Sequence, residues 1–446
     1  MTEHAIADAR EPDGAPRIAS LDIMRGIAIL GILFMNIDGM GGSMNAGHGW
    51  ALLLGWTVPD HIAWLLRQIV ADGTARCMLE MLFGAGMVIL TDRTVATAGR
   101  WAGVRRYYVR NLILFAFGMV HIFILLWPGD ILHIYGLTAL IVFPLRRLRP
   151  RWQLLLGVTF MVFTLVTGAG EVRSVAQENA LVASAAQHRA AGQPVTADEA
   201  KAVKSNDKWH AKVAEQKHMI AVENDARSGS FASWRAALIG IYTMLLGRGA
   251  PMMWLWEAGA TMLIGTALFR MGILAGQRSA RFYGGMLIAG YGLAIPLRAI
   301  GAWQTSQFGD GISIEWSTSE LARVAMTLGH VALIHLLLGT ARGRALLSPF
   351  TAAGRTALSL YICQSLIGLW LLYPPFALGL YGKMGWAGFM LTALAIDALL
   401  LLVANWWVVR FEVAPVEWAW RSLAGGRMLR FRRKSRAAVE AAPVTV

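Results

Sequence analysis

The sequence predicts an all-α, polytopic integral membrane protein with about ten transmembrane helices. Of its 446 residues, 56% are hydrophobic and only 15% are charged, and the mean hydropathy is +0.50. Several runs of about 18 to 22 residues carry almost no charge, and an α-helix needs roughly this length to cross the hydrocarbon core of a bilayer. This composition excludes an ordinary soluble protein.

Ten apolar segments are long enough to span the membrane as helices. They lie near residues 22–39, 76–92, 110–127, 130–146, 152–168, 251–270, 283–302, 321–340, 357–374 and 386–408. Two other apolar stretches, 47–69 and 235–248, are short or interrupted, and interfacial or re-entrant segments are predicted for both.

Arginine placement predicts the orientation of these segments. The segment WPGD at 127–130 has no Lys or Arg, whereas five arginines crowd the preceding connection: Arg93, Arg100, Arg105, Arg106 and Arg110. Because basic connections are retained in the cytoplasm, both termini are predicted to be cytoplasmic. The net charge of +14 is therefore attributed to topology, and no nucleic-acid partner is expected.

The chain divides into five regions. They are a polar N-terminal segment (1–20), an N-terminal membrane bundle (21–168), a polar insertion (169–235), a C-terminal membrane bundle (236–423) and a basic tail (424–446). The insertion is predicted to be extracytoplasmic and the tail cytoplasmic. Thr196 and Glu199 have the spacing of a capping box, so a helical hairpin over the outer face is expected.

Arg110 and His121 are the most informative pair of residues. Eleven residues at about 100° each make three turns and about 20°, so both side chains share one helix face about 16 Å apart. An ionisable group inside a bilayer is costly unless it lines a polar cavity, which indicates a site within the membrane. Arg25 and Asn36 repeat this spacing, and Asp22 lies one turn before Arg25, where the two can pair. Two arginines at the cytoplasmic edge suit an anionic ligand.

A short hairpin, WPGDILHIY, follows His121 and contains Asp130, His133 and Tyr135. Asp130 and His133 have the spacing of a hydrogen-bonded helical pair. A neutral imidazole beside a carboxylate can act as a general base toward a hydroxyl or an amine. Simpler alternatives stay open: His121 can bind a neighbouring helix, Asp130 can cap the next helix, and the arginines can extend to the membrane surface.

Five motifs resemble one known family. They are RxxxLDxxRG ending at Gly26, LFGAG at 82–86, GDIL at 129–132 followed by Tyr135, AGRTALSLYICQS at 353–365, and PVEWAWR at 415–421. Together they resemble the YeiB-like proteins, also known as the domain-of-unknown-function 418 family, over nearly the whole chain. Ala414 stands where the last motif usually carries glycine.

The YeiB-like family is distantly similar to the transmembrane acyltransferases of the acyltransferase-3 and heparan glucosaminide N-acetyltransferase groups. The resemblance implies a multi-pass protein of a bacterial inner membrane that moves an acyl group from acyl-CoA, such as acetyl-CoA, to an extracytoplasmic or lipid-linked hydroxyl or amine. His121 would deprotonate the acceptor or carry the acyl group, with Asp130 beside it and Asn36 at the oxyanion. The donor and substrate would contact Arg25, Arg110, Asp22, Tyr135, His133, Arg355 and Gln364.

A small-molecule transporter or permease is the alternative function. Many spans and buried polar residues suit it equally well, but no inverted repeat is visible and the first span is continuous. No metal and no permanently bound cofactor are expected. His330 and His335 are five residues apart and lie on different helix faces, which argues against a two-histidine metal site on that helix. Cys77 and Cys363 both fall in predicted spans, which argues against a disulfide framework.

Overall fold

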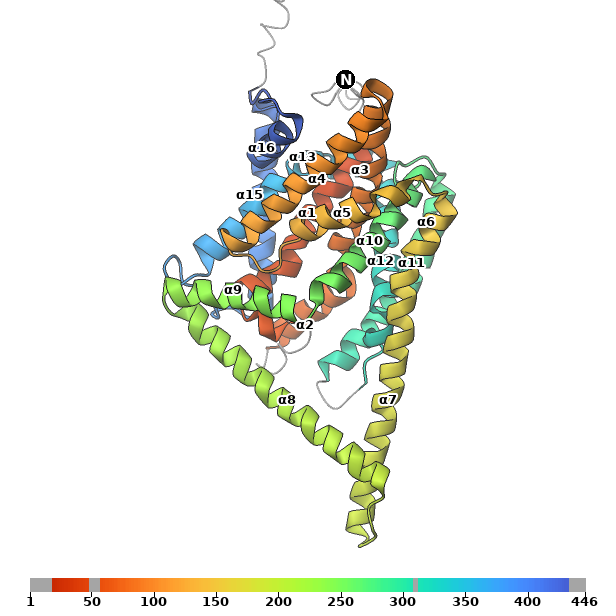
Figure 1. Ribbon diagram of the computed structural model, residues 1–446, viewed down its shortest axis with the longest axis vertical. Helices are drawn as coiled ribbons and strands as arrows, with labels where there is room; N and C mark the ends of the chain where they lie inside the picture. Colours follow the sequence, from red (N-terminus) through yellow and green to blue (C-terminus); the bar gives the residue numbers. More distant parts are fainter. Residues whose placement is uncertain (1–17, 48–56, 308–311, 433–446) are drawn as a thin grey trace, which may run out of the picture.

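The computed structural model describes residues 18–47, 57–307 and 312–432, and within these ranges it contains helices and no β-strand (Figure 1). The predicted all-α class is confirmed. The α-helices are α1 (Ala19–Gly41), α2 (Val58–Leu66), α3 (Thr74–Ala98), α4 (Arg100–Phe123), α5 (Leu132–Val142), α6 (Pro150–Gly157), α7 (Thr159–Ala190), α8 (Ala197–Ser228), α9 (Phe231–Gly247), α10 (Ala250–Arg270), α11 (Ala280–Ser306), α12 (Glu315–Leu338), α13 (Ala341–Arg355), α14 (Ala357–Ser365), α15 (Trp386–Arg410) and α16 (Pro415–Gly425). Short 3-10 or π-helical turns are η1 (Met44–Ala46), η3 (Arg67–Ala71), η4 (Phe143–Arg147) and η5 (Leu366–Leu372).

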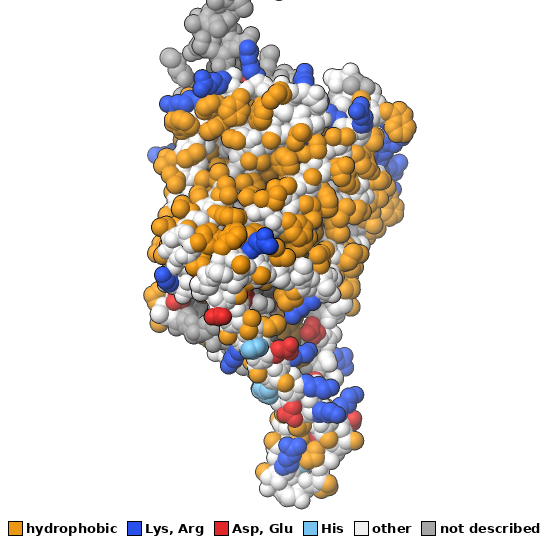
Figure 2. Space-filling model, turned by 60° about the vertical axis from the view of Figure 1, so that its left-hand side comes forward, with side chains coloured by type: hydrophobic (Ala, Val, Ile, Leu, Met, Phe, Trp, Pro, Cys, Tyr) orange, Lys and Arg blue, Asp and Glu red, His pale blue; other side chains and the backbone are white. Residues whose placement is uncertain are grey.

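Seven helical segments of the described chain are long and apolar enough to cross a membrane, or eight if a bent pair forms one span. The bent pair is α13 and the continuous α14–η5 segment, whose axes differ by 77°. Apolar side chains cover the body of the molecule in Figure 2, while charged side chains gather at its upper end and on the narrow lower projection. The polytopic membrane architecture is therefore confirmed.

The count of ten spans and the cytoplasmic location of both termini remain predictions. Two expected spans, 110–127 and 130–146, correspond to α4 and α5, which are outside the seven. The arginines of α4 lie in its first half, and α5 has only 11 residues. Parts of the predicted segments 1–20, 47–69 and 424–446 lie outside the described residues.

Glycines bring four central helices into close contact. A Cβ at Gly26 of α1 or at Gly354 of α13 would collide with a backbone carbonyl of the other helix. The same is true of Gly84 on α3 and Gly265 on α10. Small residues at helix crossings let backbones approach closely in membrane proteins. Three of these four helices, α1, α3 and α13, also line the cavity described below.

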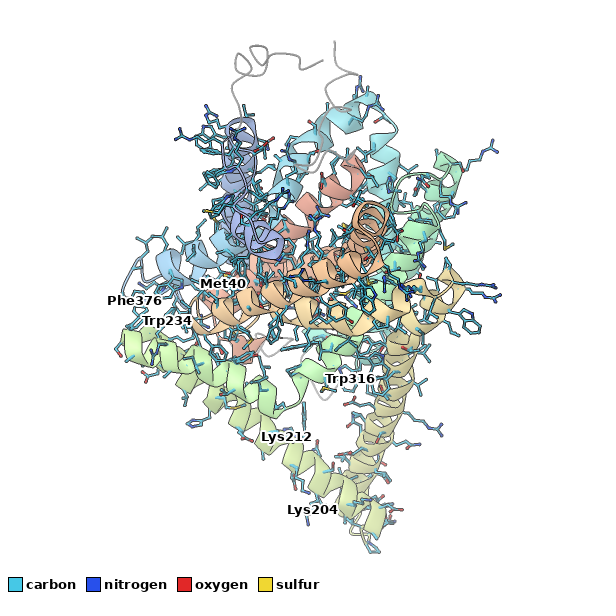
Figure 3. All side chains as sticks on the ribbon, turned by 45° about the horizontal axis from the view of Figure 1, so that its top comes forward. Met40, Lys204, Lys212, Trp234, Trp316 and Phe376 are labelled. Atoms are coloured by element: carbon cyan, nitrogen blue, oxygen red, sulfur yellow. The ribbon has the colours of Figure 1, made fainter. Side chains whose placement is uncertain are left out.

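The polar insertion forms the expected helical hairpin. No proline occurs between Pro150 and Pro194, and α7 runs well past the predicted span at 152–168, as far as Ala190. The capping box of Thr196 and Glu199 opens α8, as predicted, and Ser184 Oγ donates to Glu199 at 2.6 Å across the hairpin. The hairpin projects from the bundle, and α8 carries Lys204 and Lys212 along it (Figures 1 and 3).

The returning end of α8 is attached to the end of α1. Arg227 is fully buried and donates to the carbonyl oxygens of Gly39 (3.0 Å), Met40 (2.6 Å) and Gly42 (2.7 Å). These carbonyls belong to the last turn of α1 and the residue after it, where no further helical amide can satisfy them. Next in the chain, α9 packs Trp234 against the ring of Phe376 at 5.1 Å (Figure 3).

Candidate functional site

A cavity of about 580 Å³ is lined by residues of α16, the start of α1 and neighbouring helices. Figure 1 shows where these helices lie in the bundle. The walls of the cavity come from α1, α3, α4, α5, α13, α14 and α16. Six arginines line it: Arg25, Arg106, Arg110, Arg355, Arg421 and Arg427. Arg25 and Arg110, which the sequence placed on two separate helices, thus face the same space.

The arginines around the cavity are exposed or half-buried, whereas apolar lining residues such as Leu79 and Leu82 are buried. Asp22 and Glu417 are the carboxylates among its lining residues, against six arginines. Apolar side chains line much of the remaining wall, including Leu79, Leu82, Phe83, Met87 and Leu114, and the polar residues Thr94, Thr97 and Asn111 also line it. A ligand with an anionic head and an apolar tail matches this arrangement, since guanidinium groups bind phosphates and carboxylates through charge-assisted hydrogen bonds.

Helix α16 closes one side of the cavity. The guanidinium of Arg110 stacks on the ring of Trp420 at 3.9 Å, and Trp420 Nε1 donates to the carbonyl of Arg110 at 2.9 Å. Glu417, on the same helix, accepts hydrogen bonds from Leu358 N (2.6 Å) and Ser359 Oγ (2.5 Å) at the start of α14. The motifs PVEWAWR and AGRTALSLYICQS are therefore in direct contact.

Three buried polar side chains, linked by hydrogen bonds, lie just beyond the inner end of the cavity. His121 Nδ1 is 2.7 Å from Asp130 Oδ1, and His121 Nε2 is 2.9 Å from Ser365 Oγ. The second oxygen of Asp130 accepts from the backbone N–H of His133 at 2.9 Å and lies 2.9 Å from its Nδ1. His121 and Ser365 are both 0% exposed. We call Ser365, His121 and Asp130 the polar triad.

Tyr361 separates the cavity from the polar triad. Its side chain lines the cavity, and its ring meets the imidazole of His121 edge to face with centroids 5.0 Å apart. Its hydroxyl accepts a hydrogen bond from Ile131 N at 3.2 Å, on the loop that carries Asp130. In a molecule that fills the cavity, the inner end would therefore be separated from the imidazole of His121 by the ring of Tyr361 alone.

The connection between α4 and α5 positions Asp130. Leu126 adopts a positive φ of 60°, a conformation that is strained for a branched residue and is enriched at functional sites. Gly118 lets the loop fold back on α4, because a Cβ there would collide with His133 N and the Asp130 carboxylate. The carboxylate thereby reaches the imidazole of His121 from a position nine residues further along the chain.

Most of the residues that the sequence singled out fall into two adjoining groups. Asp22, Arg25, Arg110, Tyr135 and Arg355 line the cavity. His121, Asp130 and His133 form the hydrogen-bonded cluster beyond it.

Two predicted site residues lie elsewhere. Asn36 is half-buried on α1 and is not a lining residue of the cavity. The equal spacing of the two pairs does not bring Asn36 to His121, because α1 packs mainly against α3, α13 and α15 and not against α4. Gln364 is not a lining residue of the cavity, and its side-chain amide donates to Ile29 O and Asp397 Oδ1, both at 3.1 Å.

Comparison with known proteins agrees with the motifs. A family model described as "Protein of unknown function (DUF418)" matches residues 268–427. The chain is 29% identical over 420 residues to "Uncharacterized protein YeiB" of Escherichia coli (strain K12), covering 91% of this chain and 96% of that protein. It is 26% identical over 427 residues to "Uncharacterized protein YxaH" of Bacillus subtilis (strain 168), covering 91% of this chain and 94% of that protein. The chain is thus similar to the YeiB-like proteins over most of its length, and residues 268–427 match the DUF418 family model. No solved structure matches it at a significant level.

The site of this YeiB-like protein includes residues that sequence reasoning missed. Ser365 and three cavity arginines, Arg106, Arg421 and Arg427, were not assigned a role. Ser365 is the last residue of the motif AGRTALSLYICQS, so the resemblance pointed to the segment without pointing to the hydroxyl. No local pattern could relate Ser365 to His121, since they are 244 residues apart.

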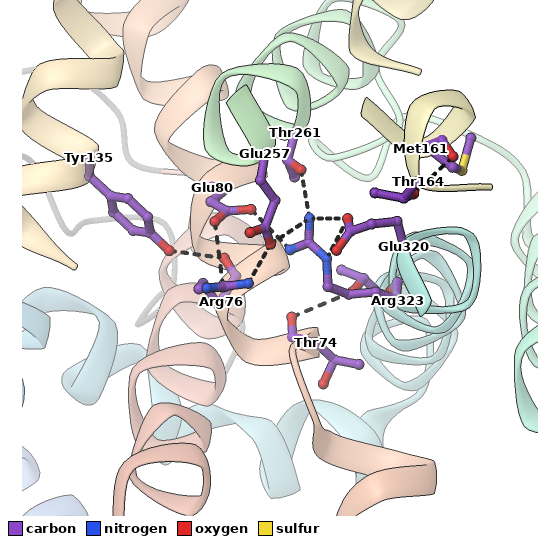
Figure 4. A network of polar contacts seen from close by, with 11 residues as sticks. Thr74, Arg76, Glu80, Tyr135, Met161, Thr164, Glu257, Thr261, Glu320 and Arg323 are labelled. Carbon is purple, nitrogen blue, oxygen red and sulfur yellow. Dashed lines mark hydrogen bonds and ion pairs between the residues drawn. The ribbon is translucent and has the colours of Figure 1, made fainter. Parts of the chain in front are cut away.

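A second buried cluster adjoins the cavity of the YeiB-like protein (Figure 4). Arg323 lies 3.1 Å from both Glu80 and Glu257 and 2.8 Å from Glu320, and Arg76 forms an ion pair with Glu257. The hydroxyl of Tyr135, a cavity residue, donates to the carbonyl of Arg76 at 3.2 Å. We call these five charged residues the ion-pair cluster. Within the described ranges, no group of His, Cys, Asp or Glu side chains has the arrangement of a metal site.

Proposed function

We propose that this YeiB-like protein is a membrane-embedded acyltransferase that uses an acyl-CoA donor. The observation that carries the proposal is that an arginine-lined cavity ends one aromatic ring away from a buried imidazole held by a carboxylate. The acceptor would be a hydroxyl or an amine, on a lipid-linked or extracytoplasmic small molecule or glycan. The relatives are bacterial, which supports an inner-membrane location.

The donor would enter with its phosphates at the arginines. Arg25, Arg110 and Arg355 come from three different helices and line one space, so they can surround a multiply charged group. The apolar inner wall suits the acyl chain and its linker. The thioester would then lie toward Tyr361 and the polar triad. Acyl-CoA is a co-substrate in this scheme, and no resident cofactor is required.

His121 would act as the proton carrier. Asp130 accepts the proton of Nδ1, so the lone pair of Nε2 is available to a hydroxyl or amine. Nε2 removes the proton of the attacking hydroxyl or amine as that group adds to the thioester carbonyl. The C–S bond then breaks and the proton passes from Nε2 to the departing thiolate, which leaves as free CoA thiol. The imidazole returns to its starting state.

Binding and transfer can be measured separately on purified full-length protein in lipid nanodiscs, with acetyl-CoA and palmitoyl-CoA as donors. Arg110→Ala and Arg355→Ala should each weaken donor binding by about 10-fold to 100-fold, since each removes a charge-assisted contact. His121→Ala should keep donor binding and lose transfer to membrane lipids or glycans. The matched control is Arg344→Ala, an exposed arginine outside the cavity.

Two results would contradict the proposal. One is wild-type protein that binds neither acyl-CoA, and the other is full transfer by His121→Ala. Accumulation of a small solute inside proteoliposomes without acyl transfer would indicate a transporter instead.

A further inference from the structure

Ser365 occupies an unusual position at a change of helix type. It is the last residue of α14, and the chain continues as the π-helical turn η5. Such π-helical turns are rare in proteins, and those that occur are often found at functional sites. The hydroxyl of Ser365 is enclosed by protein and lies 2.9 Å from His121 Nε2.

The polar triad has the order that activates a hydroxyl. A nucleophile is recognised by a base within hydrogen-bond reach that is itself oriented by a third group. Here the hydroxyl donates to Nε2, and Nδ1 donates to Asp130, whose other oxygen is held by His133. The three side chains come from α14, α4 and the connection between α4 and α5, so tertiary packing assembles them.

A hydroxyl that only satisfied a buried histidine would need no third group and no strained loop. The carboxylate, however, is positioned by the strained backbone at Leu126 and by the close approach at Gly118. Strain of this kind persists where the surrounding structure enforces it, commonly at active sites. The triad also lies directly behind the inner wall of the cavity, separated from it by the ring of Tyr361.

We propose that Ser365 is the nucleophile and carries the acyl group as a serine ester between donor and acceptor. This inference rests on the proposed acyltransferase function. The Ser365 proton moves to His121 Nε2 while Oγ attacks the thioester carbonyl, the C–S bond breaks, and the thiolate takes the proton and leaves as CoA thiol. The acceptor hydroxyl or amine then gives its proton to Nε2 and attacks the ester carbonyl. The C–Oγ bond breaks and Ser365 Oγ recovers the proton.

A covalent intermediate explains how one buried site serves two substrates. A donor in the cavity and an acceptor from the opposite side need not be present together, because CoA leaves before the acceptor attacks. Tyr361 lies one turn before Ser365 and lines the cavity, so the acyl carbonyl must pass its ring. Tyr361 is therefore a positioning residue for the first half of the reaction.

The test traps the ester on full-length protein in nanodiscs. The protein is incubated with radiolabelled acetyl-CoA or palmitoyl-CoA without added acceptor, denatured, digested and mapped by mass spectrometry. Wild-type protein should carry the acyl group on Ser365, and hydroxylamine at alkaline pH should release it. Ser365→Ala should lose the label and reduce transfer by about 1,000-fold or more, while donor affinity changes by less than about twofold. Ser348→Ala, an exposed serine on α13, should behave as wild type.

Ser365→Cys keeps the test informative if the alanine variant does not fold. It should form a thioester that hydroxylamine removes at neutral pH. The inference is overturned if wild-type protein transfers acyl groups without label on Ser365, or if Ser365→Ala transfers at the wild-type rate. In either case acyltransferase activity remains and the transfer is direct. Absence of donor binding and transfer in wild-type protein would overturn the acyltransferase function itself.

Discussion

Replacing Arg323 by methionine tests how the ion-pair cluster stabilises the bundle. Arg323 is 4% exposed on α12, and its guanidinium is shared by Glu80 of α3, Glu257 of α10 and neighbouring Glu320 (Figure 4). Methionine keeps much of the length of the side chain and removes its charge. Three carboxylates would then face the single guanidinium of Arg76.

The expected loss follows from the contacts. Arg323 lies within 3.1 Å of all three carboxylates and also donates to Thr261 Oγ1 at 3.1 Å. Removing one partner of a buried ion pair costs about 3–5 kcal/mol, because it leaves a charge that neither water nor a counter-ion stabilises. Arg323→Met should therefore lower the free energy of unfolding by about 3–5 kcal/mol.

Steric trapping in bicelles gives the free energy of unfolding without leaving a lipid environment. The control Arg344→Met removes an exposed arginine and should change it by less than about 0.5 kcal/mol. Adding Glu320→Gln to Arg323→Met should restore about 0.5–3 kcal/mol, since it removes one uncompensated carboxylate. A loss below about 1 kcal/mol in the free energy of unfolding of Arg323→Met would refute the reasoning. It would mean that the three carboxylates of the cluster do not depend on Arg323 for stabilisation of their charge.

Two other parts of the fold offer further tests. Gly118→Ala should lower the free energy of unfolding by about 1–3 kcal/mol, because the new methyl group collides with the loop that carries Asp130; Gly240→Ala, with open space around it, should not. Hydrogen bonds from Ser184 and the capping-box backbone lower the pKa of Glu199 to about 2, so this carboxylate stabilises the hairpin above its ordinary pKa of 4.5 and loses that effect as the pH falls toward 2. The distribution of distances between spin labels on α7 and α8 should broaden as the pH falls over this range, and Glu199→Gln should remove this pH dependence. A distance distribution of the wild-type protein that does not change with pH would contradict this prediction.

The sequence pointed to part of the cavity wall and to part of the polar triad. Arg25 and Arg110 both line the cavity. The sequence could point to both arginines, because helical spacing and the placement of arginines at a membrane edge are local properties. Asn36 repeated the same spacing and yet lies outside the site, because spacing describes one helix face and does not say which neighbour that face meets.

The same distinction holds at the inner end of the cavity. His121, Asp130 and His133 are close in sequence, and their association was expected from a short hairpin. Ser365, Tyr361 and Arg421 belong to the C-terminal half of the chain, so their approach depends on how α14 and α16 pack against α4.

From sequence alone came the membrane class, the helical hairpin with its capping box, and one arginine–histidine pair directed along a helix. These follow from apolar run length, periodicity and capping chemistry, which act over a few neighbouring residues. The folded chain decided that Ser365 completes the polar triad, that six arginines surround one cavity and that Asn36 belongs to neither. Contacts between helices arise from side-chain packing between distant segments, and glycine crossings such as those at Gly26 and Gly354 set which faces meet.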